Sequence, residues 1–288
     1  MPELPEVETI RRGLAKNIIG KKIAGFEADW PKMLNLPLAQ YRRVLAGKKI
    51  RAVGRRAKML IIGLDGGWRL WFHLKMTGQL VFSGGKKKVV GGHPIKEGFE
   101  QDPNRFTHAT FDFSDGSRLF FNDVRKFGWV RLFREKDLAA KLDAMKLGPE
   151  PLSPEFTLPF FQQILKKKPN AKIKAFLMDP QNVVGLGNIY SDEVCFYARV
   201  RPDRKVKDLK DAEIKLMFKG IRTILTDAIK HEGTSFSDYV NALGEAGAYT
   251  KKLKVYQRYG LKCYRCPGQV SRMKFGGRTS HFCPACQK

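Results

Sequence analysis

The spacing of hydrophobic residues changes along the 288-residue chain and divides it into differently built parts. Near the start, apolar residues recur every three or four positions, which places them on one face of a helix. They are Val7, Ile10, Leu14 and Ile18. Pro5 suits a first helical turn and Gly20 can end the helix. The pattern therefore predicts an amphipathic helix at the N-terminus.

Between about residues 21 and 133 the chain instead carries short β-rich runs. The clearest are Met59–Leu64, Arg69–Leu74, Thr107–Phe113, Arg118–Asn122 and Gly128–Phe133. Asp65-Gly66-Gly67 and Asp115-Gly116 are turn signals that join two pairs of these runs. Many short strands with tight turns predict an antiparallel sandwich or barrel. The Gly- and Lys-rich residues 83–104 are expected to form a long mobile loop.

Helical periodicity begins after residues 148–151 (Gly-Pro-Glu-Pro), a composition typical of a domain boundary. We expect one helix around residues 160–165, ended by Pro169, and three more over about 171–178, 188–199 and 210–230. Asp208 is a plausible cap for the last of these. The elements together predict an α+β multidomain protein.

Charge restricts the partners. Lys and Arg number 54 against 28 acids, for a net charge of +26, and residues 241–288 carry ten bases and one acid. This imbalance favours a polyanion partner over a merely solvated surface. An anionic membrane is the weaker alternative, because no long basic amphipathic helix stands out. No apolar run is long enough to span a membrane, and the acidic opening is unlike a secretory signal, so we expect a cytoplasmic protein.

Four of the five cysteines form two Cys-x-x-Cys pairs separated by 16 residues. They are Cys263, Cys266, Cys283 and Cys286. Two such pairs can present four thiolates to one Zn²⁺, and four protein ligands close the site to catalysis. The pattern predicts one structural Zn²⁺, which stabilises a segment that is poor in core residues. Cys195 lies in an apolar stretch and is expected to be a buried thiol.

The second residue, Pro2, offers an unusual nucleophile. Once Met1 is removed, Pro2 has a free secondary amine, and α-amino groups titrate near pH 7.7–8.0, roughly. Such an amine can attack a sugar C1′ and form an iminium, with Glu3 beside it as a proton shuttle. A Met-Pro start by itself is weak evidence for such a nucleophile, and an ordinary helix beginning is the preferred explanation on composition alone.

A series of motifs in order along nearly the whole chain carries a resemblance to a known family. They are Met1–Thr9, Arg55–Lys58, His73–Gly78, Asp123–Gly128, Leu147–Leu152, Ile173-Lys174, Val184–Tyr190, Leu253–Tyr256, Gly277-Arg278 and the four cysteines. In these motifs the chain resembles the bacterial formamidopyrimidine-DNA glycosylases, also called 8-oxoguanine DNA glycosylases.

The resemblance implies an N-terminal catalytic β-sandwich with flanking helices over residues 1–148. It implies a helix–two-turn–helix DNA-binding domain over 149–240 and a lesion-loop and zinc-finger segment over 241–288. Pro2 would be the Schiff-base nucleophile and Glu3 the proton donor and acceptor at the sugar. Lys58 would assist β-elimination or contact phosphate, and Arg278 would clamp the phosphates and assist δ-elimination.

The resemblance also implies a set of DNA contacts. A base must leave the duplex before it can be excised, and the vacated stack must be filled. Met76, Arg125 and Phe127 match the residues that fill it, although Met76 and Phe127 alone would suggest sheet core. Lys174 and Asn188 match phosphate contacts, the latter at a helix N-terminus. The remaining expected DNA contacts are His73, His108 and, in the loop 241–256 that closes over a flipped base, Tyr249.

Four residues depart from the family pattern. Lys75 and Gln257 stand where glycine is usual, Asn170 where Lys or Arg is common, and Phe106 where a second histidine is found. None matches a residue with a role in the reaction. They bear on substrate preference and DNA grip.

The resemblance implies a monomeric, nucleoid-associated repair enzyme that acts on double-stranded damaged DNA, without a membrane partner or an organic cofactor. It would excise 8-oxoguanine and ring-opened purines and then cut the strand by β,δ-elimination. Two alternatives remain: an endonuclease VIII-type enzyme that prefers oxidised pyrimidines, and a DNA-binding module that has lost catalysis. Met76, Arg125 and Phe127 favour the purine enzyme over the first, and the intact catalytic set disfavours the second.

Overall fold

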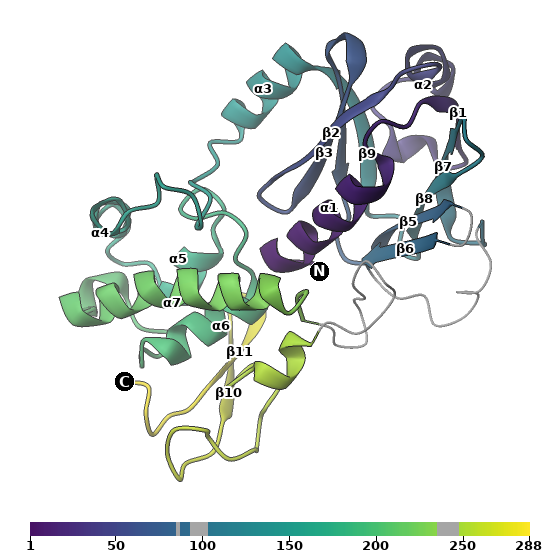
Figure 1. Cartoon of the computed structure of the whole chain (residues 1–288). Helices are drawn as coiled ribbons and strands as arrows, with labels where there is room; N and C mark the ends of the chain where they lie inside the picture. The colour runs from purple at the N-terminus through teal and green to yellow at the C-terminus, as the bar shows by residue number, and fades with distance from the viewer. Residues whose placement is uncertain (85–86, 93–102, 235–247) are drawn as a thin grey trace. The chain divides into compact units, whose positions relative to one another are not determined.

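The computed structural model describes residues 1–84, 87–92, 103–234 and 248–288. The chain forms two compact units (Figure 1). The first unit comprises Met1–Ala144 together with His231–Thr250. The second comprises Met145–Lys230 together with Lys251–Lys288.

The first unit begins with helix α1, Leu4–Ile18. Pro5 lies in its first turn, and Gly20 follows its end with a φ of +89°, a left-handed conformation that favours glycine. The predicted stripe Val7, Ile10, Leu14 and Ile18 is buried, each residue at most 1% exposed. The amphipathic helix predicted from the sequence is therefore confirmed.

Within the described residues of this unit, nine strands form two antiparallel sheets. One has the order β1-β7-β8-β5-β6 and the other β2-β3-β4-β9. The strands of the first are Ile23–Ala28, Thr107–Phe113, Arg118–Asp123, Gly78–Gly84 and Lys87–Gly92. Those of the second are Ile50–Arg56, Met59–Leu64, Trp68–His73 and Trp129–Arg134.

The two sheets pack into a sandwich, which settles the choice between sandwich and barrel. Phe72 of β4 has its ring centroid 6.0 Å from that of Phe111 on β7 and 6.3 Å from that of Phe121 on β8. All three rings are buried in a core that also takes the apolar face of α1. Burying such rings is the main favourable term that holds the sheets together.

Two expectations for this unit need correction. Part of the predicted loop 83–104 is strand, because β5 runs to Gly84 and Lys87–Gly92 pairs with it as β6. Residues 85–86 and 93–102 lie outside the described residues. Two helices also went unpredicted, α2 (Leu38–Leu45) and α3 (Glu135–Ala144). Only three of their residues are buried, so neither helix has a broad apolar stripe to read from the sequence.

The second unit is helical and ends in a hairpin. Its helices are α4 (Leu158–Lys166), α5 (Ile173–Met178), α6 (Asn188–Tyr197) and α7 (Asp211–Lys230), and the hairpin strands are β10 (Ser271–Phe275) and β11 (Arg278–Phe282). All four predicted helices are present. Asp208 does not cap α7, however, because it ends the short 3-10 helix Val206–Asp208, and the amide of Lys210 donates to Glu213 instead.

Short 3-10 turns occur at Pro31–Met33, Asp65–Gly67 and Tyr249–Lys252. Cys195 is fully buried in α6, as expected for a core thiol, and burial raises its pKa. Within the described residues, none of the helices is both long and apolar enough to cross a membrane.

Candidate active site

The N-terminal dipeptide Pro2-Glu3 is buried directly before α1. Met1 is half exposed, whereas Pro2 and Glu3 are buried, Glu3 at 3% exposure. The amide of Glu3 donates to Glu6 Oε2 at 2.8 Å, and Glu6 Oε1 accepts from both the amide and the hydroxyl of Thr234, at 2.9 and 3.0 Å. One buried carboxylate thus holds the peptide next to Pro2 and ties it to the segment that follows α7.

Lys58 lies in the tight turn between β2 and β3. The preceding Ala57 has a φ of +54°, which makes the turn sharp. Arg55 connects this turn to α1, since it donates to Ala57 O at 2.7 Å and pairs with Glu8 at 3.3 Å. Burial raises the pKa of Glu8, but hydrogen bonds from Arg11 and Arg12 and the charge of Arg55 outweigh it and lower the pKa. Glu8 therefore stays ionised and keeps the turn beside the helix.

His73 ends β4 in register with Met59, the residue after Lys58. Burial lowers the pKa of His73 to about 3, and the charges of Lys75 and Lys58 act in the same direction. Its Nδ1 accepts a hydrogen bond from the amide of Lys75 at 2.9 Å, so the proton of the neutral ring sits on Nε2. His73 can therefore serve as a neutral donor at physiological pH.

Met76, Arg125 and Phe127 are the residues expected to fill the vacated base stack, and we call them the wedge residues. They lie together on the surface of the first unit. Met76 is 44% and Phe127 51% exposed, which rules out the core positions that sequence alone would suggest. The Arg125 guanidinium donates to Met76 Sδ at 3.3 Å and lies 4.6 Å from the centroid of the Phe127 ring. Residues from two loops thus form one exposed apolar and cationic cluster.

His108 is a structural residue in this unit. It is 3% exposed, with Nδ1 2.8 Å from Asp29 Oδ1 and Nε2 3.1 Å from the carbonyl oxygen of Asp123. Both ring nitrogens are therefore occupied within the fold. His108 thus supports the backbone at Asp123, and its expected DNA contact stays a prediction.

In the second unit, α6 and the β10–β11 hairpin carry the expected phosphate contacts. Asn188 is the first residue of α6, and the described residues offer no hydrogen-bond partner to its Oδ1. Arg278 is exposed at the start of β11, after Gly276 and Gly277, whose φ angles of +55° and +72° suit a two-residue hairpin turn. A helix N-terminus and an exposed guanidinium are both groups that bind phosphate.

Lys174 is buried beneath this surface. It is 1% exposed, and its Nζ lies 2.7 Å from Asp192 Oδ1 and 2.8 Å from Ser280 Oγ. Asp192, which is fully buried, also accepts from the amide of His281 at 2.8 Å. Lys174 thus belongs to an internal ion pair that joins α5, α6 and β11, and its expected phosphate contact stays a prediction.

Tyr249 likewise lies inside its unit. It is 5% exposed, its amide donates to Gly233 O at 3.2 Å, and its ring centroid is 6.3 Å from that of His231. Its expected contact with a flipped base stays a prediction. Residues 241–247 of the expected lesion loop lie outside the described residues.

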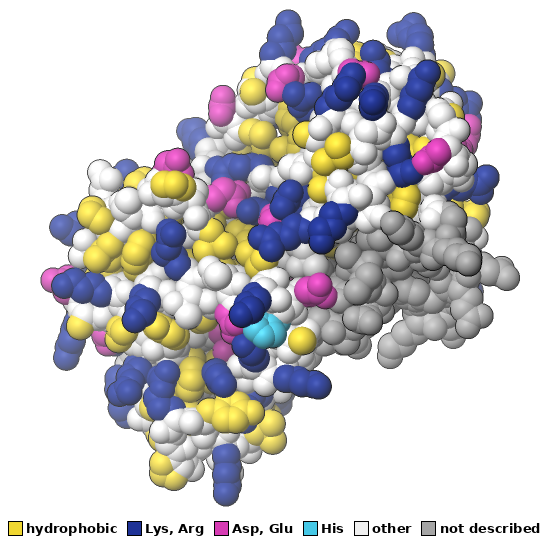
Figure 2. Space-filling model, viewed as in Figure 1, with side chains coloured by type: hydrophobic (Ala, Val, Ile, Leu, Met, Phe, Trp, Pro, Cys, Tyr) yellow, Lys and Arg dark blue, Asp and Glu magenta, His cyan; other side chains and the backbone are white. Residues whose placement is uncertain are grey.

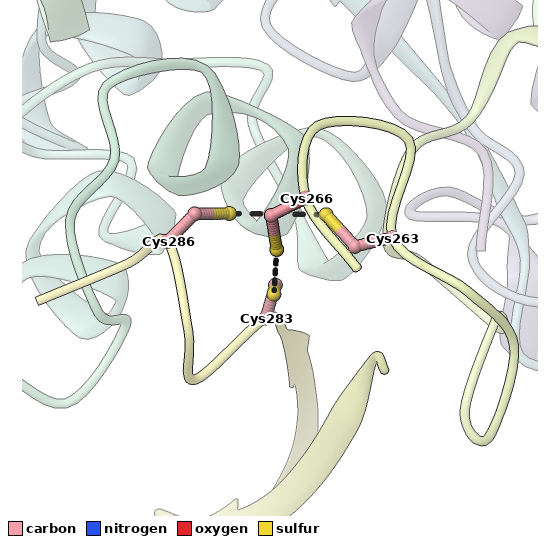
Figure 3. Close-up of side chains that lie close together, drawn as sticks. All are labelled: Cys263, Cys266, Cys283 and Cys286. Atoms are coloured by element: carbon pink, nitrogen blue, oxygen red, sulfur yellow. Dashed lines mark hydrogen bonds between the residues drawn. The ribbon is translucent and has the colours of Figure 1, made fainter. Parts of the chain in front are cut away.

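The four predicted metal ligands converge at one point (Figure 3). All four Sγ atoms lie within 4.8 Å of one another, with Cys263 to Cys286 at 3.8 Å and Cys266 to Cys283 at 3.5 Å. Four sulfurs at about 2.3 Å from a tetrahedral Zn²⁺ would be separated by about 3.8 Å. The donor set and spacing therefore fit Zn²⁺.

Lys and Arg side chains are spread over the face of the molecule drawn in Figure 2. On the face drawn in Figure 2, Lys and Arg side chains outnumber Asp and Glu on both units. This agrees with the net charge of +26 and with a polyanionic partner.

Two of the departures from the family pattern have a common backbone explanation. Lys75 and Gln257 have φ angles of +53° and +55°, in the left-handed region that glycine enters without strain. This backbone conformation is the one that favours the glycine expected from the resemblance at both positions. Nothing in the structure explains Phe106 or Asn170.

Sequence reasoning missed several buried acids that organise these sites. Asp123, Asp192 and Glu193 are at most 3% exposed. Glu193 accepts three backbone amides between Lys254 and Tyr256, each at 2.9 Å, and burial raises its pKa. The signal was available, because two adjacent acids inside the otherwise apolar helix α6 need buried partners.

Comparison with known proteins agrees with this geometry. Three family models match: the formamidopyrimidine-DNA glycosylase N-terminal domain over residues 1–130, its H2TH domain over 147–240, and the zinc finger found in FPG and IleRS over 260–288. A formamidopyrimidine-DNA glycosylase of Heliobacterium modesticaldum is 42% identical, with both chains covered completely.

Solved structures show the same fold. Lactococcus lactis Fpg in complex with abasic-site DNA has a TM-score of 0.86 and 36% identity, with 99% of each chain covered. A mutant of that protein with Fapy-dG-containing DNA has a TM-score of 0.88 and 37% identity, with both chains covered completely. The chain therefore belongs to the formamidopyrimidine-DNA glycosylase family of DNA repair enzymes.

Proposed function

We propose that this protein excises oxidised purines, 8-oxoguanine and formamidopyrimidines, from double-stranded DNA and then cuts the strand. The observation that carries the proposal is the burial of Pro2 and Glu3 at the start of α1, with the peptide between them held by Glu6. The names of the relative and of the two solved complexes support the substrate class.

Pro2 is the proposed nucleophile. With Met1 removed, its neutral amine attacks C1′ of the damaged nucleotide while the bond from C1′ to the base breaks and the base leaves with the electron pair. The attacking nitrogen then loses its only proton, and protonation of O4′ opens the sugar ring. The product is an iminium that stays cationic, because its nitrogen carries no further proton to lose. The iminium acidifies C2′, whose proton is lost as the 3′ phosphate leaves.

Glu3 is the proposed proton shuttle at the sugar. Its carboxyl group belongs to the residue next to the nucleophile and is buried, so it can deliver a proton to O4′ without competition from bulk water. Lys58 is the proposed partner in β-elimination or the contact to an adjacent phosphate, on the turn that Arg55 and Glu8 hold against α1. A second elimination then releases the 5′ phosphate.

Arg278 and Asn188 are proposed to grip the phosphates. They lie on elements that are joined within one unit, since Asp192 of α6 accepts the amide of His281 in β11. Removing either would weaken the DNA complex, and removing the charged Arg278 would also reduce its salt dependence. Arg278 is also proposed to assist the second, δ-elimination, so its loss should slow that step, whereas loss of Asn188 should leave the amine chemistry unaltered.

Met76, Arg125 and Phe127 are proposed to fill the stack that a flipped base leaves. An exposed thioether and ring held against one guanidinium fit the gap between stacked bases. His73 is proposed to donate to DNA through Nε2–H. The four cysteines would hold one Zn²⁺ that keeps the hairpin with Arg278 folded. We further propose a monomer without an organic cofactor.

A single-turnover assay on end-labelled duplexes tests the proposal. The protein with Pro2 first should excise 8-oxoguanine opposite cytosine and leave phosphate at both ends of a one-nucleotide gap, whereas a Pro2→Gly variant should be strongly impaired. An oxidised-pyrimidine duplex in parallel tests the endonuclease VIII alternative, which faster cleavage of that duplex would favour. If a duplex with a preformed abasic site also stays intact, the protein is a DNA-binding module and the proposal fails.

A further inference from the structure

The Asp123 carboxylate lies where the two wedge-bearing loops meet. Asp123 ends β8, is 1% exposed, and precedes the loop that carries Arg125 and Phe127. Its Oδ2 accepts from the amide of Gly128 at 2.6 Å, and its Oδ1 accepts from the amide of Arg125 at 3.2 Å. One carboxylate therefore closes this loop at both ends.

The same carboxylate also holds the second loop. Its Oδ1 accepts a short hydrogen bond from the hydroxyl of Thr77, the residue after Met76. Thr77 Oγ1 in turn accepts from the amide of Arg125 at 3.2 Å. The loop is closed on itself by the amide of Gly78, which donates to Leu74 O at 2.9 Å. Met76 is thus fixed to the same buried group as Arg125 and Phe127.

The surroundings of Asp123 leave the carboxylate little freedom. His108 holds its carbonyl oxygen at 3.1 Å, and Asp29 fixes His108 from the other side at 2.8 Å. A Cβ added at Gly128 would lie 3.0 Å from Asp123 Oδ2 and 2.6 Å from the Phe121 ring, so the loop end packs tightly on the carboxylate. The buried Asp123 and its partners therefore anchor the two loops from below. The wedge side chains, in contrast, are exposed and contact one another.

We propose that Asp123 is a positioning residue that holds both wedge loops as one rigid unit for insertion into the base stack. This inference rests on the proposed function. Groups ordered before binding pay no ordering entropy at the moment of insertion. Loss of the carboxylate would therefore impair removal of a base from a duplex. It would leave the amine chemistry intact on a nucleotide that does not have to be flipped out of a duplex.

Two variants separate this role from a general one. Asp123→Asn keeps the shape of the side chain but replaces one of the two acceptor oxygens with an NH₂ donor. Because both oxygens accept hydrogen bonds, this NH₂ group faces another donor, either a backbone amide or the Thr77 hydroxyl. Thr77→Val keeps the hydrogen bond from the Gly128 amide to Asp123. It removes only the Thr77 hydroxyl, whose hydrogen bonds link the two loops. The matched control is Asp112→Asn, which removes a partly exposed carboxylate paired with Arg118 on the same sheet.

The experiment compares single-turnover excision of 8-oxoguanine from a duplex with cleavage of an abasic site in a single-stranded oligonucleotide. Displacing a working group by about 1 Å can cost 10²-fold, so we expect duplex excision to fall about 10- to 100-fold in Asp123→Asn and Thr77→Val. Single-strand cleavage should stay within about twofold of the unchanged protein, and Asp112→Asn should change neither rate.

A further readout identifies action through the wedge. In a protein that already carries Met76→Ala and Phe127→Ala, Asp123→Asn should lower duplex excision by less than about twofold, because coupled residues are not additive. Equal loss on both substrates, or an undiminished effect without the wedge, would overturn the inference. If Asp123→Asn does not fold, Thr77→Val decides in the same way. If the unchanged protein cuts neither substrate, the proposed function itself fails.

Discussion

Replacing Lys174 with methionine should destabilise the second unit while leaving the DNA-binding surface largely intact. The substitution keeps much of the side-chain volume but leaves Asp192, which is fully buried, without the cation 2.7 Å away. Removing one partner of a buried ion pair costs about 3–5 kcal/mol. The free energy of unfolding falls by about 4 kcal/mol for each molar increase in guanidinium concentration. The unfolding midpoint of the variant should therefore fall by about 1 M.

The chain offers a matched control in Lys168→Met. Lys168 pairs with Asp179 at the same N–O distance of 2.7 Å, but these side chains are 40% and 33% exposed. Exposed pairs contribute about 0–1 kcal/mol, so this variant should unfold within about 0.3 M of the unchanged protein. The two variants differ in burial and not in ion-pair length.

Zinc release, measured as guanidinium is added, reports on unfolding of the second unit, because the four cysteines belong to that unit. DNA affinity at several salt concentrations gives the second readout. A phosphate contact at Lys174 would instead lower affinity, reduce the salt slope by about one and leave the midpoint unchanged. That pattern, or equal midpoints for the two variants, would refute the buried ion-pair explanation.

Three further predictions follow from the described contacts. Chelation of the metal, or Cys283→Ser, should lower DNA affinity at least about tenfold while the sandwich stays folded; affinity retained without metal, measured by gel shift, would contradict this. His73→Gln should flatten the acid side of the stability profile. The unfolded histidine takes up a proton near pH 6.5 and the folded one only near 3, so the stability it provides is complete above about 6.5 and is lost as the pH falls. Between pH 7 and 5 the unchanged protein should therefore lose up to about 2 kcal/mol more than the variant in guanidinium titrations, and parallel profiles would exclude the effect. Gln257→Gly should raise the free energy of unfolding by about 0.5–1 kcal/mol, because the exposed Gln257 has a φ of +55°; a lower melting temperature would speak against backbone strain there.

Local patterns were enough to predict much of the fold. β3 and β7 begin and end where expected, since alternation and flanking turn residues mark both ends of each strand. β6 could not be recognised in the same way, because its Lys- and Gly-rich run resembles a loop. Its pairing with β5 depends on tertiary contacts, which cannot be read from a short stretch of sequence.

The candidate site divides along a similar line. The cysteine spacing predicted a metal site because thiol chemistry and ligand spacing are local properties. Lys174, His108 and Tyr249 were expected at the DNA surface, but all three are buried. Residue type does not distinguish a cation that contacts phosphate from one that balances a buried acid. That difference depends on Asp192 and Ser280, which are distant in sequence from Lys174.

The most direct test of the account is to locate the covalent bond between the protein and DNA. The protein with Pro2 as its first residue is mixed with an 8-oxoguanine duplex and borohydride, and the trapped complex is digested and mapped by mass spectrometry. We expect a sugar adduct on the nitrogen of Pro2, and no trapped complex from a form that retains residues before Pro2. An adduct on Lys58 or another lysine, or equal trapping of the extended form, would contradict it.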